Sequence, residues 1–161
     1  MEPTKIFIQS YRGSVFDGKW ISLPMEEDEL KDILHTYDER ELFIADSEGF
    51  LSFDLNESEN LVELNEFLLK LENLDEDSQL KCKFLLETLV VRDRDDALDK
   101  YEDVFFYKGM TLLDVARDMV DSGFFGDVNK EIEKYIDFPA IARDLEMEGY
   151  VETKEGVFFC N

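Results

Sequence analysis

The most regular stretch of the chain is LVELNEFLLKLE, residues 61–72. Its leucines recur every three or four residues, which is the period of an amphipathic α-helix with one buried side. The charged side chains that this pattern turns outward are Glu63, Glu66, Lys70 and Glu72. The stretch therefore predicts a helix that packs on its leucines and carries its charge to the solvent.

The helical pattern continues beyond this stretch. Asp75-Glu76-Asp77-Ser78 is typical of a helix start, and a second apolar stripe follows at Leu80, Phe84, Leu85 and Leu89. A short charged helix is expected through Ala97 and Leu98. Because no strand pattern interrupts this region, residues 61–103 are predicted to form an acidic helical module.

Strand patterns precede this module. Lys5 to Gln9 and Trp20 to Leu23 predict two strands, separated by a turn in the region of Gly13 and Gly18. A helix with an acidic first turn is expected from Met25 to Tyr37, and a third strand from Glu41 to Ala45. Residues 1–60 are thus predicted to form an α+β module.

Residues 104–161 show the same mixture. Val104 to Tyr107 predicts a strand, and Thr111 with Asp114 resembles a capping box that opens a helix from Leu112 to Ser122, followed by Gly123. A further helix is expected from Asp137-Phe138-Pro139, because proline is harmless in the first turn. Residues 150–153 and 157–160 predict a hairpin. The fold class is therefore α+β, with three small modules at 1–60, 61–103 and 104–161.

The charge of the chain limits its partners. Its 161 residues include 40 acidic and 17 basic ones, a net charge of −23, yet 44% are hydrophobic and 14 are phenylalanine, so it can build a core. The three modules carry net charges of −10, −7 and −6, which indicates a coated surface rather than an acidic tail. Nucleic acid and anionic membranes are excluded as ligands for most of this surface, and a basic protein partner is favoured.

The residues of catalytic and metal sites are scarce. The one histidine, His35, is expected on a solvated helix, and Cys82 and Cys160 are expected to be free thiols. The acidic run at Asp93 fails as an EF-hand, since Leu98 stands where glycine is required. The sequence predicts no catalytic residue, no cofactor and no metal. Without a signal peptide or a membrane-spanning run, the protein is expected in the cytoplasm.

Residues 124–145 carry a resemblance to a known family. Phe125-Gly126-Asp127-Val128, then Tyr135-Ile136-Asp137-Phe138 and Ala140-Ile141-Ala142-Arg143-Asp144-Leu145, resemble the ArdA antirestriction family. Asp114-Val115-Ala116-Arg117, Gly18-Lys19-Trp20 and Asp46-Ser47-Glu48-Gly49 match it elsewhere. The resemblance implies three modules in an elongated, curved molecule and a head-to-head homodimer through the C-terminal modules. It also implies the DNA-binding subunits of type I restriction–modification enzymes as partners.

Two sets of site residues are predicted for a protein of this family. The resemblance places the antirestriction motif and its dimer contact at Phe125, Gly126, Asp127, Val128, Tyr135, Ile136, Asp137 and Phe138. For Tyr135, Ile136 and Phe138, core packing of the C-terminal module is an equal alternative. The carboxylates expected to stand in for DNA phosphates are Glu63, Glu66, Glu72, Asp75, Glu76, Asp77, Asp93, Asp95, Asp96, Asp99, Glu102, Asp103, Asp114, Asp118 and Asp121.

The predicted function is a folded acidic DNA mimic, not an enzyme, that occupies the DNA-binding groove of type I restriction–modification enzymes. Two alternatives stay open at this point. An acidic chaperone or adaptor would bind a basic DNA-binding protein without displacing its DNA, and a metal-dependent hydrolase would use carboxylates alone. The sequence leaves open whether modification is blocked together with restriction.

Overall fold

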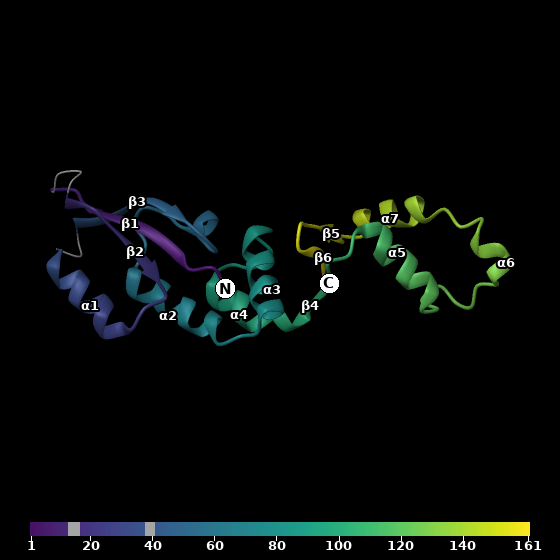
Figure 1. Cartoon of the computed structure of the whole chain (residues 1–161), viewed down its shortest axis with the longest axis horizontal. Coiled ribbons are helices and arrows are strands. Elements are labelled where there is room, and N and C mark those ends of the chain that lie inside the picture. The colour runs from purple at the N-terminus through teal and green to yellow at the C-terminus, as the bar shows by residue number, and fades with distance from the viewer. Residues whose placement is uncertain (13–16, 38–40) are drawn as a thin grey trace. The chain divides into compact units, whose positions relative to one another are not determined.

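A computed structural model describes residues 1–12, 17–37 and 41–161 of the chain. These residues form two compact units, Met1–Asp99 and Lys100–Asn161, here called the N-terminal and C-terminal units (Figure 1). Each unit contains helices and an antiparallel sheet, which confirms the predicted mixed α+β class. The division at residues 60 and 103 stays a prediction, and the turn predicted at Gly13 lies outside the described residues.

The N-terminal unit is built around a three-stranded sheet in the order β2-β1-β3. Its strands are β1 (Thr4–Ser10), β2 (Lys19–Leu23) and β3 (Leu42–Glu48), and both pairings are antiparallel. Ile6 lies opposite Ile21, and both are buried because alternate residues of a strand share one face. The three predicted strands are confirmed, with β3 extending further than expected.

In the part of this unit that the structure describes, the α-helices are α1 (Glu27–Thr36), α2 (Leu61–Glu72), α3 (Glu76–Glu87) and α4 (Arg94–Lys100). Figure 1 shows α1 and α2 along the same side of the sheet. The predicted stripe of Leu61, Leu64, Leu68 and Leu71 is buried, and the charged side chains of α2 are exposed. Asn60 caps α2 and Asp75 caps α3, since each side chain accepts backbone N–H groups of the first turn. The short 3₁₀ helix η3 (Ser52–Asp54) was not predicted.

The prediction of an apolar stripe through α3 is wrong at Leu89. The helix ends at Glu87 and Thr88 is its C-terminal cap, with the Thr88 hydroxyl donating to the carbonyl oxygen of Phe84 at 2.7 Å. Leu89 takes a positive φ of 54° and leaves its side chain 84% exposed. Leu80 is half-buried, whereas Phe84 and Leu85 belong to the core as expected.

Arg94 joins α4 to the segment that follows β3. Its Nε donates to Asp54 Oδ2 at 2.8 Å, and its Nη1 donates to Glu59 Oε2 at 2.9 Å. A third bond runs from Nη2 to the backbone carbonyl oxygen of Asp54 at 2.9 Å. Burial opposes the charge on this guanidinium, but the hydrogen bonds with Glu59 and Asp54 outweigh it and raise the pKa of Arg94. The cluster therefore holds two loop carboxylates against the helical part of the unit.

The C-terminal unit pairs a second sheet with two packed helices. The strands β4 (Val104–Lys108), β5 (Val151–Glu152) and β6 (Gly156–Cys160) follow the order β4-β6-β5. The chain enters β4 from the short 3₁₀ helix η4 (Tyr101–Asp103). Gly156 lets the backbone of β6 lie close to that of β4, because a Cβ at this position would lie 2.3 Å from the carbonyl oxygen of Tyr107. The predicted strand and hairpin are confirmed.

The helices of this unit are α5 (Leu112–Asp121), α6 (Lys130–Glu133) and α7 (Phe138–Met147). Helices α5 and α7 lie side by side, and α6 lies at the end of the pair away from the sheet (Figure 1). The core where α5 and α7 meet the sheet consists of Val115, Ala116, Met119, Leu145, Tyr150 and Val157. The predicted capping box of Thr111 and Asp114 is confirmed, as are Gly123 at positive φ after α5 and Pro139 in the first turn of α7.

Replacing Arg94 with methionine should destabilise the N-terminal unit by about 3 kcal/mol. The substitution leaves the Glu59 carboxylate, whose side chain is only 8% exposed, without its cation. Chemical denaturation at neutral pH measures the loss. Lys70→Met is the matched control, because Lys70 and the carboxylate nearest to it, Asp95, are both exposed in the same unit. Equal stabilities of the two variants would contradict the role given to Arg94.

The capping carboxylate of Asp114 should make the stability of the C-terminal unit depend on pH. Hydrogen bonds from the Thr111 backbone N–H and hydroxyl lower the pKa of Asp114 from its ordinary 3.8. Because the pKa of Asp114 is lower in the folded state, its ionised carboxylate stabilises the fold above pH 3.8. This stabilisation is lost as the pH falls through the lowered, folded-state pKa.

Thermal denaturation of the wild-type protein and Asp114→Asn from pH 7 to pH 2 tests this. The wild type should melt at the higher temperature at pH 7, and the two curves should converge at the acidic end. A difference that stays constant over the whole range would show that the carboxylate charge is not involved.

Candidate functional site

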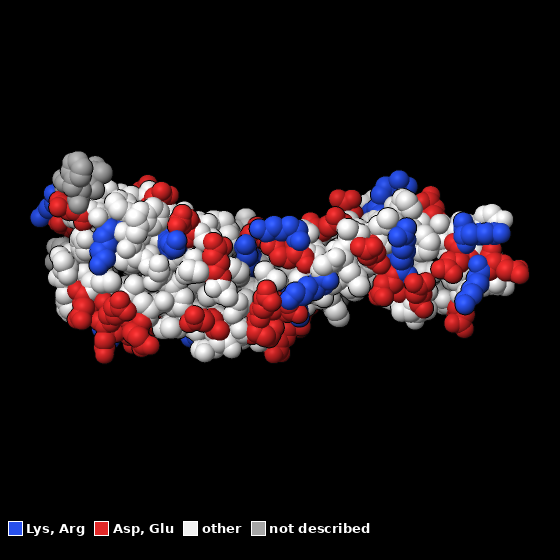
Figure 2. Space-filling view, viewed as in Figure 1, with Lys and Arg blue, Asp and Glu red and all other residues white. Residues whose placement is uncertain are grey.

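Most of the carboxylates predicted to mimic phosphates lie on the surface. Of the fifteen, Asp77 is half-buried and Asp96 is buried; the other thirteen are exposed. They occur on both units, from α2 to α5. On the face shown in Figure 2, acidic side chains form separate patches with basic and uncharged residues between them. This face therefore offers separate groups of carboxylates.

One of these groups lies on the outward side of α2. Glu63, Glu66 and Glu72 are exposed, and within the described residues no cation lies at ion-pair distance from them. They stand on one helix because their positions alternate with the buried leucines that fix its orientation. Lys70 lies beside them but is 4.0 Å from Asp95 of α4. This side of α2 can therefore accept cations from a partner.

Three other predicted carboxylates also cap helices. Asp75 accepts from the backbone and side chain of Ser78, Asp93 accepts from the backbone N–H of Asp96, and Asp114 belongs to the capping box. The Ser78 hydrogen bonds lower the pKa of Asp75 as those of Thr111 lower that of Asp114. All three carboxylates are held in place by these hydrogen bonds. Asp75 and Asp114 also stay ionised below the pH at which an ordinary aspartate takes up a proton.

Asp96 has a different position from the rest. It is 8% exposed, and its Oδ2 accepts the backbone N–H of Arg92 at 3.1 Å and lies 3.7 Å from the guanidinium of the same residue. Sequence periodicity could not show this, because α4 is short and highly charged. The carboxylate closes the turn before α4 and presents little surface to a partner.

The predicted antirestriction motif lies largely on the surface. Phe125, Gly126, Asp127 and Val128 are exposed in the segment between α5 and α6, and Tyr135 is 77% exposed. The exposed apolar side chains of the region, here called the apolar segment, are Phe124, Phe125, Val128, Ile132 and Tyr135.

The residues that end the motif are less exposed. Ile136 and Phe138 are half-buried and Asp137 caps α7, while the Arg117 guanidinium lies 5.7 Å from the Phe138 ring centroid. Tyr135 is therefore not a core residue of this unit. Ile136 and Phe138 are partly packed and partly exposed.

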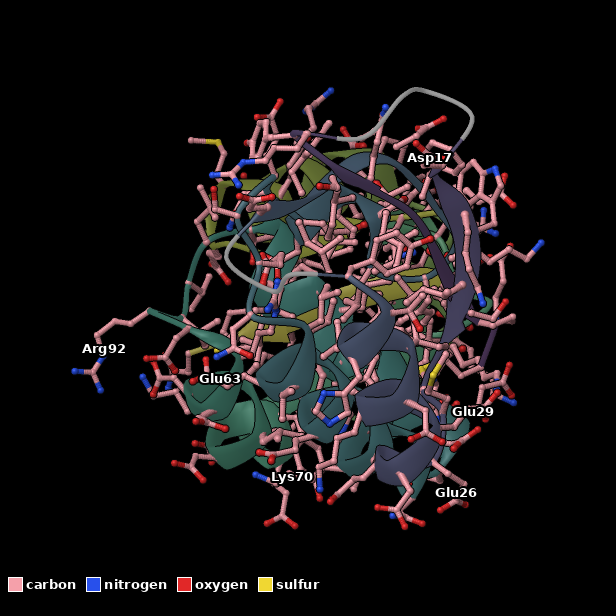
Figure 3. The ribbon with its side chains drawn as sticks, turned by 90° about the vertical axis from the view of Figure 1, so that its left-hand side faces the viewer. Asp17, Glu26, Glu29, Glu63, Lys70 and Arg92 are labelled. Atoms are coloured by element: carbon pink, nitrogen blue, oxygen red, sulfur yellow. The ribbon has the colours of Figure 1, made fainter. Side chains whose placement is uncertain are left out.

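The structure adds a groove that sequence reasoning missed. It has a volume of about 470 Å³ and lies in the N-terminal unit, between the outward side of α2, the Arg94 cluster and the α3–α4 loop. Figure 3 labels three of its lining residues, Glu63 and Lys70 on α2 and Arg92 on the loop. Asp54 and Glu59 also line it, and both are bound by Arg94, which is 40 and 35 positions away from them in the sequence. No local sequence pattern contains such a contact.

The residue types most often used as nucleophiles or bases are represented by two cysteines and one histidine. Both cysteines are free thiols, as predicted, and burial raises the pKa of the Cys82 thiol to about 12, which leaves it unreactive at neutral pH. His35 is exposed on α1. Across residues 1–12, 17–37 and 41–161, no three His, Cys, Asp or Glu side chains are placed to hold a metal ion. In the same residues, no helix has the length and apolar character needed to cross a membrane.

Comparisons with known proteins give one finding. A search of curated proteins found no match to this chain. A comparison with protein-family models matches residues 8–159 to the family described as antirestriction protein (ArdA). The match begins in β1 and ends in β6, so it covers both units. Because it spans nearly the whole sequence, this chain belongs to the ArdA antirestriction protein family.

Proposed function

We propose that this antirestriction protein acts as a folded DNA mimic, occupying the DNA-binding groove of type I restriction–modification enzymes. The observation that carries the proposal is the exposure of thirteen of the fifteen predicted carboxylates, on a chain of net charge −23. An acidic surface held by a folded core attracts the same lysine and arginine side chains that bind phosphates. The inhibitor needs no catalytic group, since it acts by occupying the groove.

The amount of charge fits a short duplex. DNA carries about one phosphate charge per 1.7 Å of axis when both strands are counted. A net charge of −23 therefore corresponds to roughly a dozen base pairs. Phosphate contacts position a protein on DNA while base contacts specify the sequence. A mimic of the backbone alone would block enzymes that recognise different sequences.

Individual carboxylates are expected to matter little, because an exposed ion pair contributes only about 0–1 kcal/mol. The triple substitution Glu63→Gln, Glu66→Gln and Glu72→Gln should weaken inhibition of a type I enzyme about tenfold. It should also reduce the dependence of inhibition on salt, since fewer charges are paired in the complex. Inhibition constants for DNA cleavage, measured at two or more salt concentrations, give both quantities.

The matched control is Asp144→Asn, Glu146→Gln and Glu148→Gln, which removes the same charge from exposed positions around the end of α7. None of these residues belongs to the predicted mimic set. If both triple variants lose the same activity, net charge alone matters and the set has no special role. If neither loses activity, the electrostatic proposal fails.

We also propose that the protein is a homodimer through the apolar segment of the C-terminal unit. Phe124 and Phe125 contact each other edge to face, with ring centroids 5.1 Å apart, and both remain exposed. Exposed apolar side chains gathered in one segment are typical of a protein-binding surface. A second copy of the chain would cover these apolar side chains.

The double substitution Phe125→Ser and Tyr135→Ser should convert the dimer to a monomer in sedimentation equilibrium. Neither side chain is in the core of its unit, so circular dichroism should show an unchanged fold. Met147→Ala, at an exposed position on α7, should remain dimeric. A wild-type protein that sediments as a monomer, or a double variant that stays dimeric, would contradict this interface.

A further inference from the structure

Leu89 combines two features that are unfavourable in the isolated protein. It follows the C-terminal residue of α3 and its cap, a position at which a left-handed backbone is usual but glycine or asparagine normally supplies it. A leucine with a φ of 54° is strained, since its Cβ approaches the neighbouring backbone. Its side chain is also 84% exposed, so burial within the chain does not offset the strain.

The next residue extends this apolar surface. Val90 is 52% exposed, while Val91 turns inward and is buried. The turn is well defined, because the backbone N–H of Thr88 donates to Phe84 at 3.0 Å and that of Leu89 donates to Leu86 at 3.3 Å. The loop thus holds two apolar side chains outward on a fixed backbone.

One member of this apolar pair, Leu89, borders the acidic groove, and Val90 follows it in the sequence. Leu89 lines the groove together with Glu63, Glu66 and Asp93, all of which are exposed. Six acidic and three basic side chains line it in total, and Arg94 already binds two of the six. The groove is therefore acidic on one side and apolar at its rim, which complements a basic surface that contains an exposed apolar residue.

We propose that Leu89 and Val90 form an apolar anchor for a basic segment of the target enzyme, in which lysine or arginine side chains flank an apolar residue. The inference rests on the proposed function and adds to it a contact that no DNA phosphate makes. Carboxylates on α2 would bind the flanking cations while Leu89 is covered by the apolar residue. The free energy of binding would then include a hydrophobic contribution, which salt does not screen.

Leu89→Gly separates this role from a structural one. Glycine accepts the positive φ without strain, so the melting temperature should stay level or rise. Affinity for a purified type I methyltransferase should nevertheless fall about tenfold, as expected for loss of one buried leucine side chain at the interface. The loss should be equal at low and high salt. Leu89→Asn, which also tolerates this backbone, should behave alike.

Met147→Ala is the control, since Met147 is 86% exposed and belongs to the C-terminal unit. It should bind like the wild type. If the wild type binds and Leu89→Gly binds equally well, the anchor is overturned while the mimic proposal stands. If the wild type does not bind the enzyme at all, the proposed function falls and the anchor falls with it.

Discussion

Repulsion among like charges is the constraint on which the rest of this structure depends. A chain with 40 acidic and 17 basic residues is destabilised by its own surface, and burial of apolar side chains must offset that cost. Both units do so with compact cores, the first on the leucines of α2 and the second where α5 and α7 meet a sheet. Part of the acidic charge is also placed where the fold favours it. Asp75 and Asp114 cap helix N-termini, where the backbone N–H groups and the helix dipole stabilise a negative charge.

The few basic residues are used in two ways. Arg94 is largely withdrawn from the surface and holds Asp54 and Glu59, so those two carboxylates are neutralised within the fold. Others, such as Arg92 and Lys70, stay exposed beside carboxylates at long ion-pair distances. The consequence is an uneven surface on which Glu63, Glu66 and Glu72 remain available to a partner. Net charge alone would not distinguish these carboxylates from those that the protein has already paired.

Local sequence patterns were sufficient to predict most of the helices and strands. The stretch 61–72 predicts α2 because every turn repeats the same arrangement of leucines and charges, and the Thr111–Asp114 spacing predicts the start of α5. Contacts between distant residues could not be predicted in this way. The Arg94 cluster joins positions 35 and 40 apart, and Asp96 is buried by a turn that its charge gives no reason to expect. Leu89 fits a helical stripe in sequence, but α3 ends two residues earlier. The family motif located the exposed apolar segment, although its pattern does not distinguish packing from contact for Ile136 and Phe138.

Competition with DNA tests the central claim most directly. A purified type I methyltransferase would be bound to a labelled duplex and titrated with this protein at low and moderate salt. DNA mimicry predicts stoichiometric release of the duplex, with neither component modified and with weaker competition as the salt concentration rises. Binding of the protein to the enzyme while the duplex remains bound would contradict mimicry and would identify an acidic adaptor instead.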